Sequence, residues 1–169
     1  MILGVLSDTH GNHRLMFEVA DLMRDTLEVT TLFHLGDDYD DAEQLAYAGY
    51  DVRKVPGLWC SEYHDGRIPN CLLEEFDGVT VAAAHADKDL RARERAAATV
   101  LTGHTHQPRI EKLGRSLYVN PGHLKSEKSR DCRPSFATIA IDETHVRAAI
   151  HRLDAKVRLT KTVLRSELG

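Results

Sequence analysis

The sequence predicts a single α/β domain built on a largely parallel sheet. Two observations predict this class. In the first third of the chain, short runs of β-branched and aliphatic residues alternate with stretches of helical period, which gives the order β-α-β-α-β typical of right-handed crossovers. In addition, several apolar runs end abruptly in acid, histidine or glycine. Because open α/β sheets bind ligands beyond the carboxyl ends of their strands, these endings also predict where the functional site lies.

The apolar run that opens the chain predicts a buried strand leading into Asp8-Thr-His10. If extended backbone continues through Thr9, Asp8 and His10 project to the same side and make half of a metal site. The alternative is a solvated turn in which Asp8 or Asn12 caps the following helix. The other elements expected in this third are a helix at 15–24, a strand at 30–35 stopped by Gly36-Asp37-Asp38, a helix at 42–48 ended by Gly49, and a strand at 52–55 broken by Pro56-Gly57.

The rest of the chain is richer in strands. A β-hairpin is expected at 72–84, because Asp77-Gly78 between two apolar runs is a strong turn signal. Its second arm ends at His85, and a strand at 100–102 runs into Gly103-His104-Thr-His106. The remaining predictions are an exposed helix at 89–98, strands at 109–113, 117–119, 136–141 and 146–153, and a polar loop at 122–134. For the last dozen residues the pattern leaves strand and helix open.

Composition places the chain among ordinary globular proteins, since 42% of its residues are hydrophobic and 28% are charged. The formal net charge of −4 disfavours nucleic acid as a partner. Three cysteines without a CxxC pair argue against a disulfide framework and favour a reducing, cytoplasmic setting. No apolar run reaches the roughly 18 residues of a membrane span, and no basic segment of a signal peptide opens the chain. A homo-oligomer is left open.

Four of the expected strand ends carry metal-ligating side chains, and the topology predicts that they converge. His104 and His106 repeat the two-residue spacing of Asp8 and His10. Two carboxylates and four imidazoles are too many for one tetrahedral centre and suit two divalent ions about 3.5–4 Å apart, with Asp37 as the natural bridge. Oxygen and nitrogen donors favour manganese, iron or zinc over calcium or magnesium, and nickel is a further candidate. The predicted metal ligands are Asp8, His10, Asp37, His85, His104 and His106.

Taken alone, a histidine at a strand end is more simply interpreted as a hydrogen-bonded, structural residue than as a metal ligand. Six ligand-type residues at four strand ends make coincidence improbable. For five other histidines the structural interpretation is the better one, and His34 is expected to be half-buried in its strand. These histidines are His13, His34, His64, His145 and His151.

The order of these motifs resembles the calcineurin-like metallophosphoesterase superfamily, and above all its short bacterial and archaeal phosphodiesterase branch. The motifs are Asp8-Thr-His10, Gly36-Asp37, His85, Gly103-His104-Thr-His106 and Asn120-Pro121-Gly122. The resemblance implies a two-sheet α/β sandwich flanked by helices, over residues 1–169. It also implies a first metal ion held by Asp8, His10 and His106, a second held by His85 and His104, and Asp37 as the bridge.

The sequence departs from this family after the third expected strand. The family has Gly-Asn-His or Gly-Asn-Cys there, and its Asn completes the second metal site and touches the phosphate. Here the run is Pro-Gly-Leu-Trp-Cys, so Leu58, which cannot coordinate, stands in place of the Asn. Glu62 and His64 are the candidates to replace it. The family's Gly-His after the ligand His85 is also absent, since Ala-Asp follows here.

The predicted activity is hydrolysis of a small phosphate ester, with phosphodiesters as the expected class. In this reaction a metal-bound hydroxide attacks phosphorus in line. No side-chain nucleophile is expected, because Ser7 and Cys60 lack a histidine–acid arrangement around them. His123 is the candidate catalytic acid for the leaving group. Arg130 and Arg133 are candidates to pair with phosphate, and both also fit solvated loop charges.

A prediction from another functional class is a catalytically weak or inactive phosphoesterase-like scaffold for protein interactions, as in the retromer coat. Loss of the Asn at Leu58 is the kind of change expected on that route. Retention of all six other ligands argues against it, since a scaffold has no physical need for them.

Overall fold

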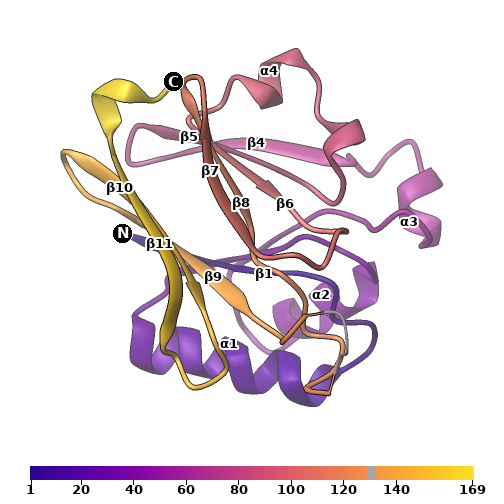
Figure 1. Ribbon diagram of the computed structural model, residues 1–169. Helices are drawn as coiled ribbons and strands as arrows, with labels where there is room; N and C mark the ends of the chain where they lie inside the picture. The colour runs from indigo at the N-terminus through magenta and orange to yellow at the C-terminus, as the bar shows by residue number, and fades with distance from the viewer. Residues whose placement is uncertain (129–131) are drawn as a thin grey trace.

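Two mixed β-sheets packed face to face form the body of the protein (Figure 1). The computed structural model describes residues 1–128 and 132–169. In spatial order the first sheet contains β11 (Val157–Leu164), β10 (His145–His151), β9 (Phe136–Ile141), β1 (Ile2–Leu6), β2 (Thr31–His34) and β3 (Val52–Lys54). The second contains β4 (Cys71–Phe76), β5 (Val79–Ala84), β6 (Thr99–Thr102), β8 (Ser116–Asn120) and β7 (Arg109–Leu113). The predicted α/β sandwich of two sheets is confirmed.

Helices α1 (His13–Leu27) and α2 (Tyr39–Tyr47) join the first three strands, and both lie on the outer side of the first sheet (Figure 1). Strands β1, β2 and β3 pair in parallel, which confirms the predicted β-α-β-α-β order. Asn12 caps α1, because its side chain accepts the Leu15 backbone N–H. The alternative of a solvated turn is otherwise wrong, since Asp8 is buried. Helices α3 (Ser61–His64) and α4 (Ala92–Arg95) are single turns, and short 3-10 turns lie at Asp87–Asp89 and Arg165–Glu167.

The sequence predictions for the second half of the chain are only partly confirmed. The hairpin is confirmed, and Asp77 and Gly78 both have positive φ, at 48° and 74°, as a tight hairpin turn requires. The exposed helix expected at 89–98 is wrong: only the single turn α4 forms there. The last dozen residues, left open by the sequence, contribute most of strand β11. The described part of the loop expected at 122–134 forms no helix or strand, and residues 129–131 lie outside the described residues.

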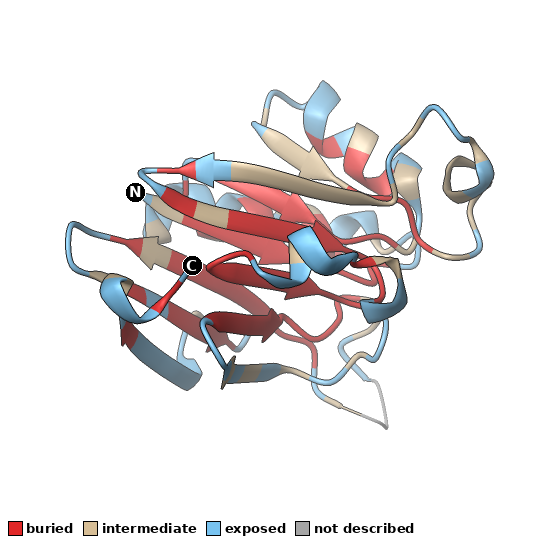
Figure 2. Ribbon diagram, turned by 90° about the horizontal axis from the view of Figure 1, so that it is seen from above, coloured by how far each residue is buried: buried red, intermediate tan, exposed pale blue. Residues whose placement is uncertain are grey.

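The main core lies between the two sheets. Leu3 and Val5 of β1 point into it, together with Val81 of β5 and Leu101 of β6. Because side chains alternate along a strand, Leu6 points the other way and packs in a separate cluster under α1. Figure 2 shows the buried residues concentrated in the central strands of both sheets. No helix in the described part of the chain is long and apolar enough to cross a bilayer.

Candidate metal centre

The candidate metal centre is built from loops that follow strands of both sheets. The loops after β1 and β2 belong to the first sheet, and the loops after β5 and β6 belong to the second. All four leave the carboxyl ends of parallel strands, where α/β sheets place their ligands. The first sheet supplies Asp8, His10 and Asp37, and the second supplies His85, His104 and His106.

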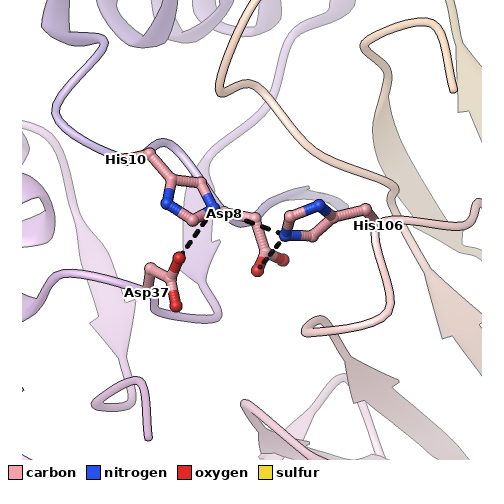
Figure 3. A group of neighbouring side chains, drawn as sticks. All are labelled: Asp8, His10, Asp37 and His106. Carbon is pink, nitrogen blue, oxygen red and sulfur yellow. Dashed lines mark hydrogen bonds and ion pairs between the residues drawn. The ribbon is translucent and has the colours of Figure 1, made fainter. Parts of the chain in front are cut away.

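Four of the predicted ligands form one compact group, Asp8, His10, Asp37 and His106 (Figure 3). One ligand atom of each lies within 4.8 Å of the others. His10 Nε2 is 2.7 Å from Asp37 Oδ2, and His106 Nε2 is 3.1 Å from Asp8 Oδ1. The two Nε2 atoms are 3.3 Å apart. Two carboxylates and two imidazoles focused on one point form a donor set that suits manganese, iron or zinc.

His85 borders this group from the second sheet and has the hydrogen bonding of a metal ligand. Its Nδ1–H donates to the carbonyl of Leu35 at 2.6 Å, so in the neutral ring the lone pair is on Nε2. That Nε2 is fully buried, has no hydrogen-bond partner, and lies 3.6 Å from Asp37 Oδ1. A ring fixed through one nitrogen with the other left as a free donor is the usual arrangement of a ligating histidine. His104 is exposed, and the centroid of its ring lies 5.1 Å from that of His85.

Left-handed turns, and not extended strands, bring the paired ligands together. Strand β1 ends at Leu6, so the expectation of extended backbone through Thr9 is wrong. Asp8 and His10 have φ of 53° and 49°, and His104 and His106 have φ of 64° and 59°. Non-glycine residues in this region cost roughly 1–3 kcal/mol each and persist only where the surroundings hold them. The same unusual backbone in both pairs therefore marks a site whose geometry is imposed by tertiary contacts.

Asp8 is the most enclosed carboxylate of the group. It is 1% exposed, and its Oδ2 accepts hydrogen bonds from Ser7 Oγ at 2.5 Å and from the His104 backbone N–H at 3.0 Å. Burial alone would raise the pKa of Asp8, but hydrogen bonds from His106 and Ser7 and the nearby imidazoles outweigh it and hold the pKa below its ordinary value. Gly103 permits this packing, because a Cβ there would come within 2.0 Å of Ser7 Oγ. Asp8 is thus ionised and ready to bind a cation.

A cavity of about 750 Å³ opens beside the group, at His104. Its lining includes Leu58, Ala86 and the polar segment around Thr105. Lys88, Arg109 and Asp87 also line it, so two cationic side chains and one acidic side chain lie next to the candidate ligands. A cavity of this size and charge can admit a phosphate ester.

The sequence matches one protein-family model over most of its length. Residues 1–144 match the model of the calcineurin-like phosphoesterase superfamily domain. The chain belongs to this superfamily. A probable metallophosphoesterase from the archaeon Methanothermobacter thermautotrophicus is 29% identical over 172 residues, which cover 93% of this chain and 95% of the relative.

Two solved structures share the fold over nearly their whole length. A conserved uncharacterized protein of Streptococcus pneumoniae TIGR4, a predicted phosphoesterase, is 25% identical with a TM-score of 0.70, covering 97% of each chain. Yfce, a phosphoesterase from E. coli, is 19% identical with a TM-score of 0.71, covering 95% of this chain and 98% of its own. The full-length match to short bacterial and archaeal relatives agrees with the branch that the motifs indicated.

Leu58, the departure from the family motif noted in the sequence, lines the cavity beside the candidate metal centre. Gly57 packs its backbone against Asp37 so closely that an added Cβ would be 2.0 Å from the Asp37 carbonyl oxygen. Leu58 follows directly and lines the same cavity as His104. Neither of its suggested replacements contacts the group among the described interactions: Glu62 accepts a hydrogen bond from Ser61, and exposed His64 packs edge-on against Tyr63.

The other residues predicted for the phosphoesterase chemistry are spread more widely. His123 is fully buried, donates from Nε2 to the Cys132 carbonyl at 2.9 Å, and packs its ring 5.3 Å from that of His106. Arg133 lines a different cavity, with Glu127 and Asp154. Arg130 lies outside the described residues. Proton donation by His123 stays a prediction, and its enclosed position places it behind a ligand instead of in the open cavity.

A hydrogen-bonded network around buried Asp41 supports the candidate ligands and was not predicted from the sequence. Asp41 of α2 accepts hydrogen bonds from Thr9, Gly11 and His13, and Thr9 also contacts His34 Nε2 at 3.2 Å. Burial would raise the pKa of Asp41, but these hydrogen bonds, that of Thr9 first, hold it below its ordinary value. His34 is fully buried, so the expectation of a half-buried residue is wrong. Asp41 carried no signal, since it is one acid in the run Asp37-Asp38-Tyr-Asp40-Asp41.

Acidification of the metal-free protein is expected to cost stability through His34. Burial lowers the pKa of His34 to about 4 from an ordinary value of 6.5. Below pH 6.5 the unfolded chain therefore binds a proton that the folded chain refuses. The contribution of neutral His34 is present above that pH and is lost as the pH falls to about 4; the gap between the two pKa values corresponds to about 3 kcal/mol.

Urea unfolding at about pH 7 and about pH 4.5 tests this expectation. The loss of unfolding free energy between the two should be smaller in His34→Gln, which keeps an N–H for Thr9 but does not titrate. An equal loss in both proteins would contradict the assignment to His34.

Proposed function

We propose that the protein is a metal-dependent phosphodiesterase that uses two divalent transition-metal ions. The observation that supports two ions is the environment of Asp37. Its Oδ2 faces His10 of the compact group, while its Oδ1 faces the buried, unpartnered Nε2 of His85. A carboxylate with a different histidine at each oxygen is suited to bridge two cations.

The first ion would be held by Asp8, His10 and His106, and the second by His85 and His104, with Asp37 shared. Bound metal would supply a nucleophile from water near neutral pH and neutralise charge on the phosphate oxygens. Lys88 and Arg109 of the adjoining cavity would hold the ester group or a second phosphate oxygen. Manganese, iron, zinc and nickel all fit the oxygen and nitrogen donors.

No side-chain nucleophile is needed in this proposal. The Cys60 thiol donates to the Gly57 carbonyl, and burial raises its pKa. A protonated thiol that is already hydrogen-bonded to the backbone is a poor nucleophile.

Hydrolysis of a chromogenic diester, bis(p-nitrophenyl) phosphate, tests the proposal. Protein stripped with EDTA should be inactive, added Mn²⁺ should restore activity, and the diester should be turned over faster than p-nitrophenyl phosphate. Elemental analysis should approach two ions per chain in excess metal. Cys60→Ala is the matched control and should keep nearly full turnover.

Each part of the proposal has its own contradicting outcome. Saturation at one ion per chain would reject the dinuclear centre, and faster monoester hydrolysis would reject the diester preference. A metal-loaded protein that hydrolyses neither ester would support the scaffold function instead.

A further inference from the structure

Asp41 makes an unusual set of contacts for an acid in the first turn of a helix. It is 3% exposed, and its carboxylate accepts three hydrogen bonds. The Thr9 hydroxyl and the Gly11 backbone N–H, at 2.9 Å, both donate to Oδ2. His13 Nε2 donates to Oδ1 at 2.7 Å. All three donors come from the short segment that surrounds His10.

That segment needs external support. Asp8, His10 and Gly11 all have positive φ, the last at 72°, so the turn that presents two ligands is unfavourable for an isolated chain. Strand β1 has already ended at Leu6, and α1 begins only at His13, so neither element fixes the turn from within. The three hydrogen bonds to Asp41 span it from one side.

The supporting carboxylate belongs to the segment that also carries Asp37. Asp41 lies in the first turn of α2, four residues after the candidate bridging ligand. The Asp8 backbone N–H donates to the Gly36 carbonyl at 2.8 Å, so the two loops are tied at a second point as well. Asp41 and this backbone bond together set the spacing between the loop of Asp8 and His10 and the loop of Asp37.

The hydrogen bonds of this network run in one direction, from His34 through Thr9 to Asp41. Since the Thr9 hydroxyl donates to Asp41, it accepts from His34 Nε2–H at 3.2 Å. His34 and Thr9 are both fully buried. Hydrogen bonds in such chains strengthen one another, which makes the position of Thr9, between the two ligands Asp8 and His10, well determined.

We propose that Asp41 is a positioning residue of the metal centre: it holds the Asp8–His10 turn against the Asp37 loop, so that the ligand atoms are correctly spaced before metal binds. This inference rests on the proposed metal-binding function. Asp41 itself contacts no candidate ligand side chain among its described hydrogen bonds, and acts through Thr9, Gly11 and His13. Outer partners of this kind typically change metal affinity by about 10–100-fold.

The first test compares Mn²⁺ binding to Asp41→Asn and Asp40→Asn by electron paramagnetic resonance titration. Asp41→Asn removes the negative charge and leaves one acceptor atom in place of two, so one of the three hydrogen bonds must be lost or reversed in direction. We expect Mn²⁺ affinity to fall on the order of tenfold and the visible spectrum of bound Co²⁺ to shift. Asp40 is exposed in the same helical turn, and Asp40→Asn should change neither.

A second pair of variants keeps the test informative if Asp41→Asn does not fold. Thr9→Val removes only the hydroxyl at nearly constant shape, and should weaken Mn²⁺ binding. Thr9→Ser restores the hydroxyl and should restore affinity. A merely structural role would lower the unfolding temperature of these variants without changing affinity or the Co²⁺ spectrum of the folded protein.

The outcomes separate this inference from the proposed function. Folded Asp41→Asn or Thr9→Val that binds Mn²⁺ as the wild type does, with an unchanged Co²⁺ spectrum, overturns the role of Asp41 and leaves the metal centre intact. Wild-type protein that binds no Mn²⁺ overturns the metal centre itself, and the positioning role with it.

Discussion

Asp37→Asn should abolish tight binding of both metal ions and reduce diester hydrolysis by more than about 100-fold, beyond the effect of outer partners. Asp37 is the one carboxylate of the group that faces histidines on both sides, His10 at 2.7 Å and His85 at 3.6 Å. The substitution keeps its shape but removes the negative charge that both cations would share. Metal content after dialysis and turnover at saturating Mn²⁺ measure the two effects.

Asp40 is an exposed acid three residues after Asp37. Asp40→Asn is therefore the matched control for the change in net charge. It should retain wild-type metal content and turnover. Two ions bound with undiminished affinity in Asp37→Asn would show that the bridging role belongs to another residue.

Leu58→Asn should strengthen binding of the second ion by at least about tenfold, comparable with the effect of an outer partner. In the wild-type protein that ion would have Asp37, His85 and His104 but no amide oxygen, so the two ions should bind unequally. Because Gly57 packs on the Asp37 backbone and Leu58 lines the cavity with His104, an amide at position 58 would lie beside the second set of ligands. Calorimetric titration with Mn²⁺, combined with turnover at limiting metal, measures the gain.

Leu58→Ala distinguishes the effect of a new metal ligand from the effect of a larger cavity, because it opens the cavity without adding a donor. It should give no gain in affinity. Equal affinity for both ions in the wild type, with no gain in Leu58→Asn, would mean that another residue already completes the second site, and Glu62→Gln is the first variant to examine then.

The convergence of four candidate ligands could be predicted because the signals for it are local. Each predicted ligand follows an apolar run that becomes a strand, and the parallel order of β1, β2 and β3 brings the ends of the first two together. The helical period of its apolar residues predicted α1, and the Asp77-Gly78 turn signal predicted the hairpin. The prediction required only that the ends of these strands lie close together. The ligand atoms of Asp8, Asp37 and His106 do lie close together.

The turns and the supporting network could not be predicted, because they depend on distant residues. Positive φ at Asp8 and His104 opposes local preference and is stabilised by contacts such as the one between Ser7 and Gly103. Asp41 and Thr9 are 32 positions apart, and nothing in the acidic run distinguishes Asp41 from Asp40.

The wrong helix prediction at 89–98 has a similar cause. The segment is rich in alanine and arginine, which favour a helix. However, Ala97 packs in the cluster on the outer face of the second sheet, and the chain must enter β6 at Thr99. Burial of the last residues and the start of the strand leave room for one turn, so tertiary packing overrides the propensity.

The division of the candidate ligands between the two sheets would make a bound cation a structural cross-link. A cation shared by Asp8 and His106 would join a loop of the first sheet to a loop of the second, at the end of the sandwich away from the hairpin turn. Metal that binds only the folded chain adds to its stability in proportion to the logarithm of the free metal concentration. Metal supply would therefore set the resistance of the sandwich to opening and to proteolysis, and a cell poor in metal would hold this protein in a more easily degraded form.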